Sequence, residues 1–212
     1  MKEFVRIYES LHKQCSYHCR HLGHLKGLIE NDDWIRVVNG STIGRVLFLG
    51  NSEIINSLIL FNTRMFDKQT DTITIHKLAK NLPSNDDIEV HHRARMKKIK
   101  IDYDIGPYYS AREKFCEISR ALKKDRTKEA LRALRNHTLA HNLEPEIEPT
   151  RATLNDLVKL TGDVNELVGL AGFISISTRS VYPDFVAKAE SETRVFYSVL
   201  PALASLENSS AK

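Results

Sequence analysis

The chain has 212 residues and a mass of 24.2 kDa, a size that suits one globular domain. Apolar residues make up 42% of it and charged residues 27%, the ordinary balance of a protein with a continuous core, which excludes wholesale disorder. Three cysteines are too few, and odd in number, for a disulfide framework. The longest apolar runs, 46–49 and 169–174, are too short for a membrane span, and the first residues lack the apolar run of a secretory signal. We therefore expect a cytoplasmic protein without a membrane segment.

The spacing of apolar residues at three and four positions predicts an all-α protein. Only nine glycines and six prolines interrupt this pattern, and the β-branched run 72–75 is too short to change the class. Residues 84–107 form the least regular stretch, and their structure stays open. The expected helices span residues 4–30, 42–66, 75–82, 108–124, 127–141, 154–171 and 184–206.

Local signals mark several of the helix ends. Ser41 or Thr42 is expected to cap the second helix, and Thr153 with Asp156 has the spacing of a capping box. Two prolines in the connector 142–149 end the helix before it. Short connections between long amphipathic helices favour an up-and-down bundle. We expect a single domain over residues 1–206, followed by a disordered tail at 207–212.

The positive charge is concentrated in the middle of the chain. Residues 91–135 hold fourteen Lys and Arg against six Asp and Glu, although the whole chain has a net charge of only +4. A solvated surface is the ordinary explanation of such a run. Contact with a phosphate backbone is the alternative, because clustered cations displace counterions from a polyanion. The residues of this segment that we expect to contact a nucleic-acid backbone are Arg93, Arg95, Lys97, Lys98, Lys123, Lys124, Arg126, Lys128 and Arg132.

The segment 135–142, at the end of a predicted helix, carries an arginine, two imidazoles and two amides within about two turns. On a straight helix Arg135 and His141 point about 120° apart, so they become neighbours only if the last turn unwinds or a second copy completes the site. His137 and His141 share a face. An imidazole near a helix end is suited to proton transfer near neutral pH.

Arg135-Asn136-His137-Thr138-Leu139-Ala140-His141 resembles the R-x(4-6)-H motif of the HEPN superfamily, in which a polar residue often follows the arginine. The long helix that ends in residues 60–67, the basic middle and the helix at 153–171 resemble its abortive-infection U-like branch. The pattern covers about three quarters of the chain, but only the seven-residue motif is specific.

The resemblance implies an all-helical bundle that dimerises and brings two Arg-His motifs to one cleft. Many members are endoribonucleases that need no metal or other cofactor, and serve as toxins or phage-defence effectors with an antitoxin partner; others are inactive and bind nucleic acid or a partner protein. Carried over to this chain, His141 is the acid or base, Arg135 the phosphate ligand and Asn136 an orienting residue, with His137 as an auxiliary. RNA cleavage needs such groups, because a proton leaves the 2′-oxygen, another reaches the 5′-oxygen, and charge develops on the phosphate.

A purely structural role for Arg135 and His141 is the competing interpretation. A histidine near a helix end commonly binds a loop carbonyl, and an arginine there can satisfy the acidic connector that holds Glu144, Glu146 and Glu148.

A second constellation, His12, Cys15, His18, Cys19, His21 and His24, could supply zinc ligands from one helix. Buried thiols on an apolar stripe explain the two cysteines equally well, and no second Cys/His pair follows, so we expect no metal site. His91 and His92 are expected on the basic surface. The chain contains no phosphate-binding, dinucleotide-binding or nucleophile-elbow motif, which argues against an NTPase, a dinucleotide enzyme and an α/β-hydrolase.

Overall fold

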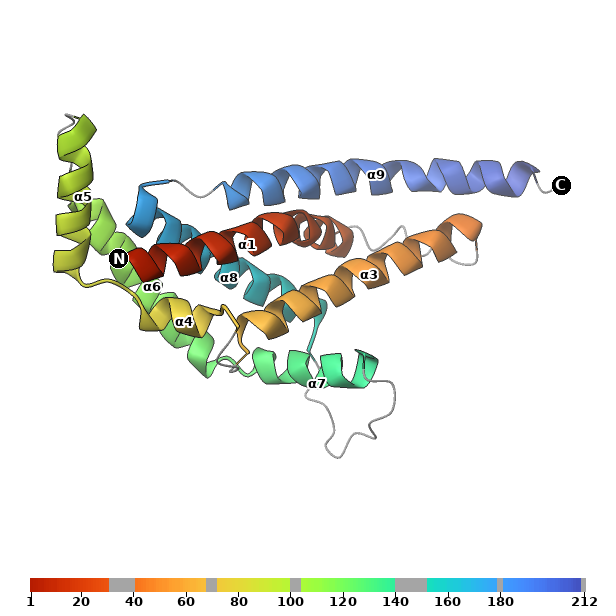
Figure 1. Ribbon diagram of the computed structural model, residues 1–212. Coiled ribbons are helices and arrows are strands. Elements are labelled where there is room, and N and C mark those ends of the chain that lie inside the picture. The colour runs from red at the N-terminus through yellow and green to blue at the C-terminus, as the bar shows by residue number, and fades with distance from the viewer. Residues whose placement is uncertain (31–40, 68–71, 100–103, 140–151, 179–180, 211–212) are drawn as a thin grey trace.

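The computed structural model describes residues 1–30, 41–67, 72–99, 104–139, 152–178 and 181–210. Over these ranges the protein is all-α, with eight helices and no strand, which confirms the predicted class (Figure 1). The helices are α1 (Lys2–Ile29), α3 (Thr42–Met65), α4 (Ile75–Lys80), α5 (Asn85–Ile99), α6 (Gly106–Lys124), α7 (Thr127–Leu139), α8 (Leu154–Ile176) and α9 (Tyr182–Ser210).

Helix α1 lies at the centre of the core and packs against α3, α8 and α9. Its apolar stripe, from Phe4 through Leu11 to Leu25, is buried, as its spacing predicts. Helix α9 follows α1 side by side and comes very close to it (Figure 1). A Cβ atom at Gly23 would lie 2.3 Å from the carbonyl oxygen of Val186, so the absence of a side chain there sets how closely the two helices pack.

The predicted helix caps are present. Ser41 Oγ accepts the backbone N–H of Gly44 at 2.9 Å and so begins α3. At the start of α8, Asp156 N–H donates to Thr153 Oγ1 at 3.1 Å, and Thr153 N–H donates to the Asp156 carboxylate at 2.9 Å. These reciprocal bonds form the capping box that the sequence indicates, with Asp in the usual place of Glu.

The stretch that the sequence left open contains α5, which binds the end of α8 through polar side chains. His92 Nε2–H donates to Ile174 O at 2.7 Å, His91 Nε2–H to Ser175 O at 2.9 Å, and Arg95 Nη1 to Ile176 O at 2.6 Å. Carbonyls in the last turn of a helix have no partner within that helix, so α5 satisfies them from outside.

The expectation that His91 and His92 belong to the basic surface is wrong for His92, which is fully buried. Its ring packs on Tyr108, with 4.0 Å between the ring centroids. Tyr108 Oη donates to Ser177 Oγ at 3.0 Å, and Ser177 Oγ lies 3.3 Å from His92 Nδ1. Because His92 donates from Nε2 to a carbonyl, a neutral imidazole that accepts at Nδ1 satisfies the whole chain of bonds.

Helix α9 continues to Ser210, past the expected end at Leu206. Helix α3, with 24 residues, is long and apolar enough to cross a membrane by length and composition alone. Its apolar side chains Val46, Phe48 and Leu49 are 64–70% exposed. One helix of this kind is weak evidence for a membrane span, because helices of soluble proteins pass the same test.

Candidate nucleic-acid interface

One face of α7 carries three cations in a row. Lys128, Arg132 and Arg135 stand at positions i, i+4 and i+7, which align along one side of a helix. The row begins where α7 packs against the end of α3: Lys128 Nζ lies 5.4 Å from the centre of the Phe66 ring, and Arg132 Nη2 donates to Phe66 O at 3.4 Å. These contacts fix the first two cations in place.

Beside this row lies a cleft of about 460 Å³ between the end of α3, α4, α6 and α7, which we call the α7 cleft. Three cations face two carboxylates, Asp67 and Glu129, in its lining. The exposed His76 also lines the cleft. The polar and aromatic residues that line the α7 cleft include Phe66, His76, Lys123, Lys128, Glu129 and Arg132. A cleft with a cationic excess and an aromatic wall is suited to a phosphate and its attached base.

The corner between α6 and α7 adds exposed cations next to the cleft. Lys123, Lys124 and Arg126 are exposed at this corner. Asp125 Oδ1 accepts the backbone N–H of Thr127 at 2.8 Å, which shapes the turn. The structure therefore brings five of the predicted RNA-binding residues together in one region: Lys123, Lys124, Arg126, Lys128 and Arg132.

The other four predicted RNA-binding residues lie on α5, at the opposite end of α6 (Figure 1). A 19-residue helix such as α6 is about 28 Å long, so the basic segment forms two separate groups. Arg93 pairs with Glu89 at 2.5 Å, and Arg95 donates to the end of α8, whereas Lys97 and Lys98 are exposed. Two of these four cations thus already have protein partners.

At the predicted catalytic motif, Arg135 Nε and Nη2 both donate to Asn136 Oδ1, at 3.1 and 2.9 Å. Asn136 thereby binds one edge of the guanidinium group. Arg135 is half-buried and continues the cationic row of α7 away from the cleft. The backbone of His137 belongs to α7, but its side chain lies outside the described part, and His141 lies wholly outside it.

Three histidines of α1 form hydrogen bonds with separate partners. His12 Nδ1 is hydrogen-bonded to Tyr182 Oη, His18 Nδ1 donates to Gln14 O at 2.8 Å, and His24 Nε2 donates to Asn51 Oδ1 at 2.9 Å. No group of three or more His, Cys, Asp or Glu within the described residues is placed to hold a metal ion. The zinc alternative therefore finds no support in α1.

Cys15 and Cys19 are fully buried in the core. Burial raises the pKa of the Cys19 thiol to about 12 and raises the pKa of Cys15 strongly. Both thiols remain protonated near neutral pH and pack as small apolar groups.

The sequence did not indicate that Phe66 and His76 line the cleft, because neither belongs to a motif. The available signal was indirect: Phe66 is a large apolar residue directly after the last residue of α3, and such a residue packs against whichever helix covers that end.

Comparisons with known proteins give no relative for this chain. No protein-family model matches it, and neither a curated protein nor a solved structure is significantly similar. The resemblance to the HEPN superfamily stays a prediction that depends on the motif at 135–141.

Proposed function

We propose that this protein is an RNA-binding protein of the HEPN type, and that it cleaves RNA without a metal ion or other cofactor. The observation that carries the proposal is the row Lys128, Arg132 and Arg135, which leads from the α7 cleft to the Arg-Asn-His segment. Such a row follows a phosphate backbone, because each cation can replace one condensed counterion.

The proposed reaction is an internal transesterification. A base takes the proton of a 2′-hydroxyl, whose oxygen attacks the adjacent phosphorus, and an acid protonates the departing 5′-oxygen. The products are a 2′,3′-cyclic phosphate and a 5′-hydroxyl. Arg135, held by Asn136, binds the phosphate as charge develops, and His141 serves as acid or base with His137 as an auxiliary.

A homodimer completes this site. Residues 135 and 141 point about 120° apart on a straight helix, so one helix does not supply an adjacent Arg-His pair by itself. Two copies that bring their α7 ends together would place the arginine of one beside the histidine of the other. A role as toxin or phage-defence effector, an antitoxin partner and a cytoplasmic location follow from the same resemblance and belong to the same proposal.

The second candidate is a HEPN-type module that binds nucleic acid or a partner protein without cleaving RNA. It is favoured by the α7 cleft, whose described lining holds the three cations Lys123, Lys128 and Arg132. Both candidates predict RNA binding, and only the first predicts a chemical step.

The deciding experiment is cleavage of a mixed RNA pool by the purified full chain in excess EDTA, with analysis of the product ends. The variants are Arg135→Ala and His141→Ala, and the matched control is Arg6→Ala, an exposed arginine of α1 paired with Glu3 at 2.6 Å. We expect the wild type and Arg6→Ala to leave 2′,3′-cyclic phosphates, and the two site variants to lose activity by at least about a hundredfold. Equal cleavage by all four proteins, or none by the wild type, contradicts the ribonuclease proposal.

A further inference from the structure

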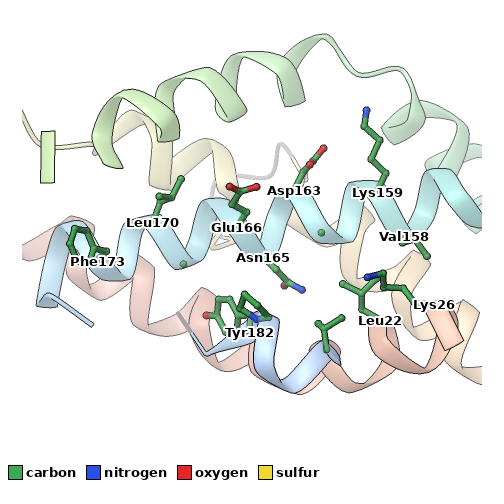
Figure 2. Close-up of a pocket in the computed structure, with 14 residues that line it drawn as sticks. Leu22, Lys26, Val158, Lys159, Asp163, Asn165, Glu166, Leu170, Phe173 and Tyr182 are labelled. Carbon is green, nitrogen blue, oxygen red and sulfur yellow. The ribbon is translucent and has the colours of Figure 1, made fainter. Parts of the chain in front are cut away.

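A second cavity, of about 630 Å³, lies between α1, α8 and the start of α9, and does not involve α7. Its volume is within the range of small-molecule sites. Leu22, Leu170, Phe173 and Val186 contribute to a mostly apolar wall. Figure 2 shows the side chains of α8 on one side of this space and Leu22 and Tyr182 on the other. We call it the α8 cavity.

Asn165 is a polar residue of this lining whose side chain has no hydrogen-bond partner among the described residues. Its relative exposure is only 4%, and neither Nδ2 nor Oδ1 is paired within that part of the chain. In Figure 2 its amide points from α8 toward the side of Leu22 and Tyr182. Native proteins pair nearly all buried polar atoms, so an amide with neither donor nor acceptor satisfied requires an explanation.

Gly162 leaves open space on the stripe of α8 that holds Asn165. Val158, Gly162, Asn165 and Gly169 stand at i, i+4, i+7 and i+11, which form one stripe of the helix. A Cβ atom at Gly162 would meet nothing within 4 Å. No neighbouring helix therefore requires a glycine there, although glycine disfavours a helix interior.

The charges around the α8 cavity balance. Lys26 and Lys159 stand against Asp163 and Glu166 in the lining. Lys26 pairs with Glu190 at 3.2 Å, and Glu166 pairs with Lys114 at 2.5 Å, so each has a counterion within the protein. Burial raises the pKa of Asp163, the direction expected where a charge is poorly solvated. An uncharged ligand fits this environment better than an ion.

We infer that the α8 cavity binds an uncharged, mostly apolar small molecule that presents an N–H donor beside a C=O acceptor to Asn165. A carboxamide has such an edge, which pairs with an asparagine side chain through two parallel hydrogen bonds. The apolar body of the ligand packs on Leu22, Phe173 and Val186. This site goes beyond the proposed function, because it uses neither RNA nor any residue of α7.

The test uses two probes that share a ring, benzamide and toluene, titrated into the ¹⁵N-labelled full chain. The readout is the side-chain amide signal of Asn165, identified by its loss in Asn165→Leu, together with the backbone signals of α8. Gly162→Leu adds a bulky side chain to the stripe of α8 that holds Asn165, at a position where the added Cβ meets no protein atom. Neither substitution removes a hydrogen bond within the described part of the protein, so both variants should fold.

We expect benzamide to shift the Asn165 amide signal saturably and to bind the wild type about tenfold more tightly than toluene. Asn165→Leu should abolish this preference while still binding toluene, and Gly162→Leu should bind neither probe. The inference is overturned if benzamide causes no saturable shift up to its solubility limit, if the two probes bind the wild type equally, or if either variant binds benzamide as the wild type does. RNA cleavage by the same samples reports separately on the proposed function.

Discussion

The side-chain amide of Asn62 donates to Thr161 Oγ1 across 2.8 Å, and this bond joins α3 to α8 inside the core. The same amide donates to Leu58 O at 2.9 Å, and Thr161 Oγ1 donates to Leu157 O at 2.7 Å. Both side chains are at most 1% exposed. Removing one partner leaves a buried polar group of the other unpaired, which costs more than the bond itself contributes.

We therefore expect Thr161→Val and Asn62→Leu each to lower the free energy of unfolding by about 1–3 kcal/mol. The double variant should lose less than the sum of the two, because no stranded partner remains. Urea unfolding of the four proteins measures this coupling. Strictly additive losses would show that the two side chains do not act as a pair.

One buried histidine and three half-buried ones make the free energy of unfolding depend on pH. Burial lowers the pKa of His12, His18, His21 and His92 below the ordinary value of 6.5. As pH falls through 6.5, the unfolded chain binds protons more readily than the folded one, so the free energy of unfolding falls with pH. Once pH is below the lowered pKa values of the folded state, both states are protonated at these histidines, and they lower the free energy of unfolding no further.

Denaturant unfolding from above pH 6.5 down to about pH 5 measures this effect. Asp87 and Asp156 have lowered pKa values, so each stabilises the folded protein above the ordinary pKa of 3.8. This contribution to the free energy of unfolding is lost only as pH falls below 3.8, outside the interval measured here. A free energy of unfolding that is constant or rises over this interval contradicts the prediction.

RNA binding should depend on the α7 group of cations more than on the α5 group. Replacing Lys123, Lys128 and Arg132 by glutamine should reduce the slope of log affinity against log salt by about 2, given about 0.7 counterions released per contact to a single strand. The control, Lys97→Gln with Lys98→Gln, removes exposed charge from α5. An equal loss of slope per charge in both variants would show that binding is not localised at the α7 cleft.

Two glycines of α8 should respond in opposite ways to a methyl group. Gly162→Ala should raise the free energy of unfolding by about 1 kcal/mol, because the added Cβ meets open space and alanine favours a helix. Gly172→Ala should lower it, since a Cβ there would lie 2.7 Å from Tyr8 Oη. Thermal unfolding of the two variants is the measurement, and effects of the same sign contradict the packing described here.

The thiols should differ in reactivity. Cys116 is half-buried, whereas Cys15 and Cys19 are fully buried with raised pKa values. Alkylation of the native protein near neutral pH should therefore modify Cys116 first, and the other two only after unfolding. Peptide mass spectrometry gives the order. Added zinc should neither protect Cys15 and Cys19 nor raise the melting temperature, and protection by zinc would revive a metal site on α1.

Sequence periodicity predicted most of the helices because they bury continuous apolar stripes. Helix α5 escaped prediction because it is held by His91, His92 and Arg95, whose role depends on the carbonyls of a distant helix. Ile88 is its one fully buried apolar side chain within the described residues. Polar side chains that bind a distant helix in this way produce no hydrophobic periodicity in the sequence.

The candidate sites also differ in how far the sequence could predict them. The cationic row of α7 follows from residue spacing within one helix, so the sequence could indicate it. The separation of the α5 cations from that row depends on how α6 lies between them, and the α8 cavity depends on the meeting of three helices. The sequence shows Asn165 between Gly162 and Gly169 on one stripe of the helix. It does not show whether the asparagine side chain is paired, because that depends on the neighbouring helices.

The attachment of α5 to the end of α8 also divides the molecule by local stability. The last carbonyls of α8 accept hydrogen bonds from α5, and Ile88 is the one fully buried apolar side chain of α5 within the described residues. We therefore expect these two segments to open together as one cooperative unit, while the core of α1, α8 and α9 stays closed. Amide protons of α5 and of the final turn of α8 should exchange with deuterium together, well before those around Leu11 and Val164.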